Sequence, residues 1–215
     1  MTGLRTVQRL YGLVAGIYDL RVGPFLRRRK TALEALRPRP GDTVLDLACG
    51  TGLNFRHIIE RIGPEGRIVG VDCTRAMLKR ARRKLARHRW DGATLVEGDA
   101  TRLPLANESC DGVLCSYAMA IIPDYRQAIA EAVRVLRPGG RLVLLEPKRG
   151  TALWARAVTP LVALSGLGVV HLDRRAWEEL PGLLENVSRR DYLGGLVYIA
   201  SGRKAKEAGD GPHHS

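Results

Sequence analysis

The stretch VLDLACGTG, which runs from Val44 to Gly52, decides the fold of this chain. Its first four residues are mostly apolar, which is typical of a strand buried in a parallel sheet. Gly50 and Gly52 allow a tight turn, and a helical pattern of apolar residues begins at Leu53. The stretch therefore predicts a strand, a glycine turn and a helix N-terminus, an arrangement that points free backbone N–H groups at a ligand.

Asp46 stands on the predicted strand, just before the turn. A dinucleotide-binding fingerprint reads G-x-G-x-x-G, whereas this chain reads D-x-A-x-G-x-G. A carboxylate at this place suits a cationic group, such as the ammonium of a methionine moiety, and would repel a pyrophosphate. The sequence therefore argues against a dehydrogenase.

Two further acids end the next two predicted strands. Asp72 closes the strand at 67–72, about 20 residues after the turn, where a carboxylate can accept both hydroxyls of a ribose. Asp99 closes VEGDA after the third strand, where it can meet an adenine amine. Because ligands bind over the carboxyl ends of the strands in such sheets, these acids and Ser116 predict one nucleoside site.

These motifs resemble those of the class I S-adenosylmethionine (SAM) methyltransferases. DLACGTG is similar to their glycine motif, GVDCTRAML to their ribose motif, EGDATRLP to their adenine motif, and LRPGGRLVLLEP to the segment entering their fifth strand. The resemblance covers about residues 43–147. It departs at Ala48, where many members carry glycine, although the ubiquinone/menaquinone methyltransferases often carry alanine there. The resemblance implies SAM as cofactor and S-adenosylhomocysteine as product.

The residues of these motifs form the predicted cofactor-binding set. It comprises Asp46, Ala48, Cys49, Gly50, Thr51, Gly52, Asp72, Cys73, Met77, Asp99, Ala100 and Ser116. No metal site is expected, because the four cysteines form no C-x-x-C pair and no pair of histidines completes a zinc pattern. The cysteines are expected to be core thiols in a reducing cytosol.

Alternating strand and helix patterns predict the α/β class, with a Rossmann-like, doubly wound sheet of seven strands and helices on both faces. The sheet is expected to be mostly parallel and to end in an antiparallel hairpin at Leu193-Gly194, with strand five at 141–145 after a turn at 138–140. We expect a helical cap at 1–40, a SAM-binding core at 41–202 and a flexible tail at 203–215.

Two stretches each allow two interpretations. Apolar residues recur at helical spacing from Val7 to Tyr18, followed by a basic block at 25–30. They predict either helices that cap the core, or a lid or membrane-surface element with arginines toward lipid phosphates. The apolar stretch 153–170 predicts either a lid over an apolar substrate or an ordinary core helix.

The net charge of +13 favours an anionic partner, or else reflects only a solvated basic surface. Nucleic acid is not the expected partner, because the chain lacks the N/D-P-P-Y and P-C motifs of base-modifying methyltransferases. An anionic membrane surface stays open. The first residues lack the apolar core of a signal peptide, so we expect a cytoplasmic protein, or a peripheral one on the inner face of the membrane. The oligomeric state is not predicted.

The segment after strand four, SYAMAIIPDY (116–125), is apolar and suits a lipophilic acceptor. This segment and DYLGGLVYIASG (191–202) resemble bacterial phospholipid and betaine-lipid N-methyltransferases. LPLANESCDGV (103–113) resembles the ubiquinone/menaquinone C-methyltransferases, whose Arg-Asn after strand four is replaced here by Met119-Ala120. We expect N-methylation of a phospholipid amine of the phosphatidylethanolamine type. The alternatives are C-methylation of a quinone precursor, or methylation of another small molecule.

An ammonium substrate must lose its proton before it attacks a methyl group. The candidates to assist are Tyr18, Tyr117 and His171, and Tyr18-Asp19 resembles the "YD" ahead of the core in lipid and quinone methyltransferases. Arg174, Arg175 or the N-terminal arginines are the candidates to meet a lipid phosphate. The intact acids and glycines argue against a non-catalytic binding module.

Overall fold

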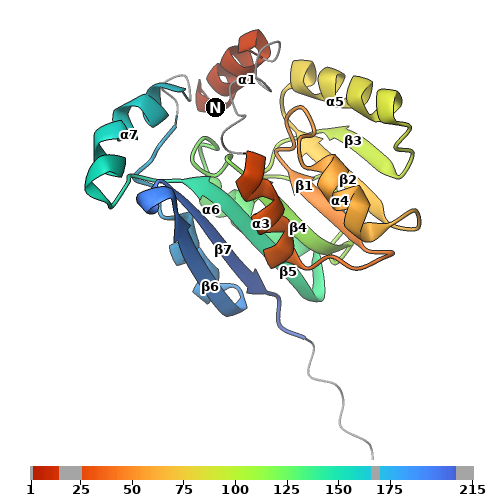
Figure 1. Cartoon of the computed structure of the whole chain (residues 1–215). Helices are drawn as coiled ribbons and strands as arrows, with labels where there is room; N and C mark the ends of the chain where they lie inside the picture. The colour runs from red at the N-terminus through yellow and green to blue at the C-terminus, as the bar shows by residue number, and fades with distance from the viewer. Residues whose placement is uncertain (1, 15–25, 166–169, 207–215) are drawn as a thin grey trace, which may run out of the picture.

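The computed structural model describes residues 2–14, 26–165 and 170–206 (Figure 1). Tyr18 and most of the predicted tail lie outside these residues. Within them, no helix is long and apolar enough to cross a lipid bilayer.

Seven strands form one sheet in the order β3-β2-β1-β4-β5-β7-β6 (Figure 1). They are β1 (Thr43–Leu47), β2 (Arg67–Asp72), β3 (Ala93–Glu97), β4 (Cys110–Ser116), β5 (Leu136–Pro147), β6 (Glu185–Tyr192) and β7 (Val197–Arg203). Strands β1 to β5 pair in parallel, whereas β7 runs antiparallel to both β5 and β6. The predicted fold class, with its antiparallel hairpin at the end of the chain, is confirmed.

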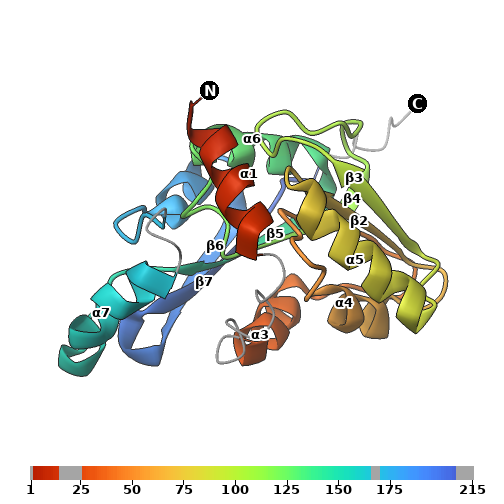
Figure 2. The same cartoon turned by 90° about the horizontal axis from the view of Figure 1, so that it is seen from above.

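Helices cover both faces of the sheet (Figure 2). The helical elements are α1 (Thr2–Val14), α3 (Leu26–Leu36), α4 (Phe55–Ile62), α5 (Arg75–His88), α6 (Tyr125–Val135), α7 (Leu153–Ser165), and the 3-10 turns η2 (Ala176–Gly182) and η3 (Leu193–Gly195). Helices α3, α4 and α5 pack on one face, and α6 and η2 on the other. Because side chains alternate along a strand, Leu45 and Leu47 face α6, whereas Asp46 points toward α3 and α4.

Two predicted boundaries are wrong. A turn was expected at 138–140, but these residues lie inside β5, which begins at Leu136. Leu136 pairs with Cys110 of β4, the register then shifts, and regular pairing with β4 resumes at Arg141. The flexible tail was expected from Arg203, but this residue ends β7. Lys204 then pairs with Glu108 at 3.0 Å, which holds the chain to the core beyond the strand.

Helix α7 is not the core helix that one interpretation of stretch 153–170 predicts. Leu153, Trp154 and Leu161 are 85%, 56% and 68% exposed, and Ala155 is the one buried residue among residues 153–161, whose burial is described. The helix lies beside the β6–β7 hairpin, where Trp154 contacts Gly194 (Figure 1). None of its described side chains reaches the pocket at the strand ends, so the lid interpretation gains no contact from them either.

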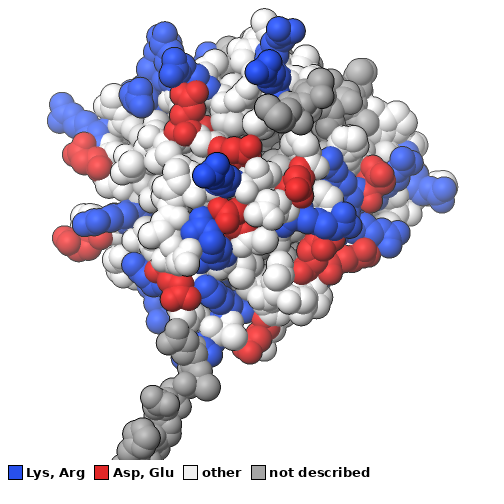
Figure 3. Space-filling view, turned by 180° about the vertical axis from the view of Figure 1, so that it is seen from behind, with Lys and Arg blue, Asp and Glu red and all other residues white. Residues whose placement is uncertain are grey.

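The basic residues of α5 form a solvated face, as the spacing of its apolar residues indicates. Met77, Leu78, Ala81 and Leu85 are buried, and the charged side chains between them lie toward solvent. Figure 3 shows basic side chains spread over the back of the molecule with acidic ones among them. The basic side chains of α5 therefore contribute to the net charge as solvent-exposed surface residues.

We expect Gly52→Ala to lower the free energy of unfolding by about 3 kcal/mol, because it adds steric overlap to an unfavourable backbone conformation. Gly52 has φ 75°, and a Cβ there would lie 2.6 Å from the Phe55 ring. Gly41 also has a positive φ, 87°, but a Cβ there would face open space, so Gly41→Ala should cost only about 1 to 2 kcal/mol. Urea unfolding of both variants measures the difference, and equal losses would contradict the clash.

Candidate cofactor site

A pocket opens over the carboxyl ends of β1, β2 and β4, where the predicted nucleoside site lies. Its floor comprises Ala48, Gly50, Val71, Asp72, Cys73, Thr74, Met77, Gly98, Asp99, Ala100 and Ser116. Its remaining walls come from α1 and from the segment after β4: Leu4, Val7, Tyr11, Tyr117, Ala118, Ile121, Ile122 and Pro123. Eight of the twelve predicted cofactor residues therefore line one pocket.

The other four predicted residues do not line it. Cys49 packs into the core on the α4 side, close to Gly70, and burial raises the pKa of its thiol. Thr51 is buried, and Gly52 lies against the Phe55 ring. Cys49, Thr51 and Gly52 belong to the glycine turn itself, and Asp46 lies behind this turn.

Asp72 fastens the glycine turn to β2. Its Oδ2 accepts the backbone N–H of Gly50 at 2.9 Å, and its Oδ1 accepts that of Thr74 at 2.7 Å. Burial raises the pKa of the Asp72 carboxyl, while these two donors act in the opposite direction. The carboxylate is thus held rigidly at the pocket, where a ribose diol can meet it.

Asp46 carries an unsatisfied acceptor directly behind the pocket. The amide nitrogen of Asn54 donates to Asp46 Oδ1 at 2.7 Å and approaches Ser116 Oγ at 3.3 Å. Asp46 Oδ2 is buried and has no hydrogen-bond partner among the described residues. Burial raises the pKa of Asp46 to about 7, while Asn54 and Arg29 lower it. A buried acceptor without a donor fits a group that brings one, such as the ammonium of SAM.

Arg29 supports the site, a role that the sequence analysis did not give it. One of the two interpretations of the basic block at 25–30 turned its arginines toward lipid phosphates, but Arg29 is only 5% exposed. Its Nη1 donates to Asn54 Oδ1 at 2.9 Å, and its guanidinium lies 5.2 Å from the centre of the Tyr117 ring. The signal was present in the sequence, because Arg29 shares one helical face with the buried residues Ala32, Leu33 and Leu36.

Glu146, at the end of β5, is a second residue that the sequence analysis missed. Its carboxylate is buried and accepts the backbone N–H groups of Ala118, Met119 and Ala120 at 2.9, 3.0 and 3.2 Å. Burial raises the pKa of Glu146 to about 7, while these donors act in the opposite direction. The side chain therefore fixes the segment that forms the acceptor-side wall of the pocket.

The two arginines proposed to meet a lipid phosphate have other partners. Arg174 Nη1 donates to the carbonyl of Met119 at 2.9 Å and also to that of Ile122. Arg175 pairs with Glu178 at 3.2 Å. Arg174 thus supports the same segment as Glu146, from its carbonyl side.

Only one of the three predicted catalytic residues reaches the pocket within the described part of the chain. Tyr117 lines it in a left-handed backbone conformation, with φ 60°, and its N–H donates to Leu145 at 2.7 Å. The His171 side chain is exposed and absent from the lining, although its backbone N–H bonds to Ala120. Tyr18 lies outside the described residues.

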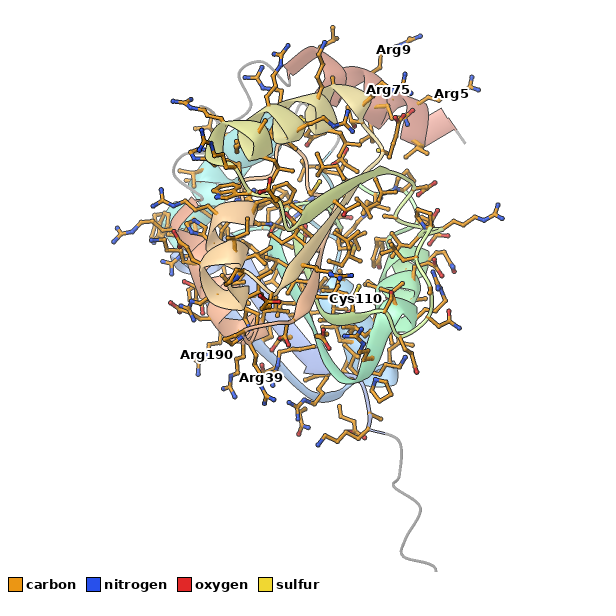
Figure 4. The ribbon with its side chains drawn as sticks, turned by 90° about the vertical axis from the view of Figure 1, so that its right-hand side faces the viewer. Arg5, Arg9, Arg39, Arg75, Cys110 and Arg190 are labelled. Carbon is orange, nitrogen blue, oxygen red and sulfur yellow. The ribbon has the colours of Figure 1, made fainter. Side chains whose placement is uncertain are left out.

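The apolar stripe at the N-terminus also faces the pocket. Leu4, Val7 and Tyr11 of α1 form a wall, whereas Arg5 and Arg9 project away from the core (Figure 4). This part of the stripe is therefore half-buried against the pocket, whereas Leu13 is 80% exposed.

Stability without cofactor should fall as the pH rises from about 4.5 to about 7. Glu146 has a raised pKa in the fold, so the native protein keeps a proton that the unfolded chain releases near pH 4.5. The stabilisation is complete below that pH and is lost as the pH approaches 7. A rise of the Glu146 pKa from 4.5 to about 7 corresponds to roughly 3 kcal/mol in the free energy of unfolding. The raised pKa of Asp46 changes this free energy in the same direction.

Urea unfolding at pH 5 and pH 7.5 measures this loss. A Glu146→Gln variant should lose less stability between these pH values than the wild type, and the variant of an exposed acid, Glu65→Gln, should match the wild type. Identical pH dependence in Glu146→Gln and the wild type would show that Glu146 does not titrate in this range.

A family described as "Methyltransferase domain" matches residues 44–140. Three relatives are informative. The demethylmenaquinone methyltransferase of Desulfitobacterium hafniense is 29% identical over 83% of this chain and 79% of its own length. An uncharacterized 37.1 kDa protein in a Streptomyces fradiae transposon is 40% identical over 86% of this chain, which spans 62% of that relative. The Listeria monocytogenes demethylmenaquinone methyltransferase is 36% identical over 55% of this chain and half of its own length.

Solved structures agree on the fold. The cyclase SpnF superposes with a TM-score of 0.78 at 16% identity, over 94% of this chain and 97% of SpnF. A geranyl diphosphate C-methyltransferase of Streptomyces coelicolor superposes with a TM-score of 0.68 at 14% identity, over 83% of this chain and 80% of that enzyme. A Haemonchus contortus N-methyltransferase bound to phosphomonomethylethanolamine superposes with a TM-score of 0.69 at 14% identity, over 84% of this chain and 53% of that enzyme. The latter two were crystallised with S-adenosylhomocysteine.

At these identities the structural likeness carries the fold but not the acceptor. The strand order, the three acids at successive strand ends, the unsatisfied Asp46 oxygen and the match over residues 44–140 agree with one another. Residues 44–140 of this chain therefore form a methyltransferase domain that resembles the class I, SAM-dependent type.

Proposed function

We propose that this enzyme transfers the methyl group of SAM to a ring carbon of a lipophilic quinol. The observation that carries the proposal is the composition of the pocket. Among the described residues that line it, Asp72 and Asp99 are the only charged side chains, and both belong to the cofactor motifs. No lysine, arginine or histidine is part of this lining.

The acceptor side of the pocket consists of aromatic and aliphatic side chains. Tyr11 and Tyr117 contribute rings, and Ile121, Ile122 and Pro123 contribute apolar surface. Walls of this kind suit a flat ring that carries a hydrocarbon chain. The names of the Desulfitobacterium and Listeria relatives support the same acceptor class.

A phospholipid amine, which the sequence analysis favours, has less support. Its phosphate needs a cationic partner, since burying an unpaired charge is costly. Arg174 and Arg175 are held by the loop carbonyls and by Glu178, and Arg29 is held by Asn54.

The departure from the quinone enzymes at Met119-Ala120 has a structural account. Met119 is fully buried in the core and Ala120 is 3% exposed. Neither residue lines the pocket. The difference at this pair therefore changes the packing behind the wall and leaves the surface that faces the acceptor apolar.

SAM supplies an electrophilic methyl group on a positively charged sulfur. The chain provides position and exclusion of water: Asp72 and Asp46 would hold the two polar ends of the cofactor, and the apolar walls would bring the ring carbon to about 3 to 3.5 Å from the methyl. Ionisation of a neighbouring ring hydroxyl makes that carbon nucleophilic. A carbon–carbon bond forms as the carbon–sulfur bond breaks, and the ring then loses a proton to water.

Methyl-labelled SAM tests the proposal with three acceptors: a demethylated naphthoquinol kept reduced, the same compound oxidised, and vesicles containing phosphatidylethanolamine. We expect label in the reduced ring compound only, because the oxidised ring lacks the electron density for attack. Label in phosphatidylethanolamine and none in the quinol would overturn the proposal in favour of the lipid amine.

A further inference from the structure

Basic side chains surround a second hollow, at the opposite end of the parallel strands from the cofactor pocket. The hollow measures about 540 Å³ and lies where β1, β4 and the regular part of β5 begin. Its charged lining comprises six cations and two carboxylates: Arg37, Arg39, Arg137, Arg141, Arg203, Lys206, Asp42 and Asp111. Figure 3 shows basic side chains at this end of the molecule, near the point where the chain leaves toward its C-terminus.

Both carboxylates of the hollow are already engaged. Asp111 Oδ2 accepts the backbone N–H of Thr43 at 2.8 Å and Nη1 of Arg137 at 2.6 Å. Asp42 Oδ2 accepts the backbone N–H of Arg39 at 2.7 Å. Asp111 forms an ion pair with Arg137, and six cations against two carboxylates leave the lining with a net charge of about +4.

Arg141 and Arg203 stand directly opposite each other on the antiparallel strands β5 and β7. Like charges in this position destabilise a sheet. Within the described residues neither forms an ion pair, nor does Arg37, and Nε of Arg203 is buried without a hydrogen-bond partner. Burial and the charges of Arg37 and Arg203 lower the pKa of Arg141. The strands thus retain a repulsive arrangement that an anion would relieve.

We propose that this hollow is a binding site for a small anion with two or more linked phosphate groups. Guanidinium groups match phosphate oxygens two at a time, and three that form no ion pair within the described residues, those of Arg37, Arg141 and Arg203, line this hollow. The cations line a concave space rather than an extended flat face, which favours a small ligand over a bilayer or a nucleic acid. The site is independent of the methyl acceptor, because it lies away from the cofactor pocket.

Calorimetric titration of the full chain with inorganic pyrophosphate, at about 0.15 M salt to screen weak surface binding, tests the site. We expect saturable binding of one pyrophosphate per chain. Arg141→Gln combined with Arg203→Gln should weaken it by at least about tenfold, since charge-assisted hydrogen bonds are lost. The matched control is Arg83→Gln with Arg87→Gln on the exposed face of α5, which removes the same charge and should leave the affinity within about twofold.

Two further measurements separate a built site from general charge. Without pyrophosphate, the Arg141/Arg203 double variant should melt at the same temperature as the wild type or higher, because a like-charge pair has been removed. Its affinity for S-adenosylhomocysteine should be unchanged, which also shows that it is folded.

The proposal is overturned if the wild type shows no saturable binding at millimolar pyrophosphate, or if the α5 control loses as much affinity as the Arg141/Arg203 variant. It is also overturned if the wild type binds vesicles of anionic phospholipid but not pyrophosphate, since the charge would then serve a lipid surface.

Discussion

An Asp72→Ala enzyme should bind S-adenosylhomocysteine about 100-fold more weakly than the wild-type enzyme. Asp72 lines the pocket and is held in place by the N–H groups of Gly50 and Thr74. The variant loses the acceptor for the ribose hydroxyls and also releases the glycine turn. Each charge-assisted hydrogen bond contributes about 1.5 to 3 kcal/mol, so the loss of two accounts for this factor.

The product nucleoside is the suitable ligand for this measurement, because it binds without reacting. Isothermal titration gives the affinity, and circular dichroism establishes that the variant is folded. Asp91→Ala removes the same charge from an exposed turn and should bind as the wild type does. If folded Asp72→Ala bound within about threefold of the wild type, the cofactor would have to lie elsewhere.

An Arg29→Met variant should bind the same ligand about tenfold more weakly, although Arg29 does not itself line the pocket. Arg29 holds the oxygen of the Asn54 amide, whose nitrogen bridges Asp46 and Ser116. It also supplies the positive charge that lowers the pKa of Asp46. Without Arg29, Asn54 is no longer oriented, and Asp46 is protonated over a wider pH range.

The control for this effect is the exposed Arg27→Met in the same basic block, which removes equal charge. Arg29→Lys keeps the charge but offers a different hydrogen-bond geometry, so its affinity for S-adenosylhomocysteine should lie between those of the wild type and Arg29→Met. Equal affinities of the Arg27 and Arg29 variants would show that the buried network does not act on the cofactor.

That Asp72, Asp99 and Ser116 line one pocket could be predicted from the sequence, because their positions follow from the topology of the sheet. Asp72 and Ser116 each end a parallel strand, Asp99 follows β3 by two residues, and parallel strands bring their carboxyl ends to one edge of the sheet. The local sequence pattern of each strand is sufficient to predict where such residues lie, whatever their distance from one another along the chain.

The supporting residues could not be found in the same way, because they act through long-range contacts. Glu146 closes an apolar strand, and nothing in its neighbours indicates that three N–H groups from residues 118–120 converge on it. The side chain of His171 is polar and lies near the right segment, yet it points to solvent. Arg29 was hidden by its basic neighbours, although its helical face was readable.

Helix α1 forms a side of the pocket through Leu4, Val7 and Tyr11, whose side chains are half-buried. It packs mainly on α5, and Gln8 donates to the carbonyl of Cys73 at 2.9 Å. Segments with few buried contacts open at far lower free energy than the sheet unfolds. We therefore expect the product nucleoside to leave past α1, without a change at the strand-end acids, and variants that weaken the contact of α1 with α5 to alter the rate of product release.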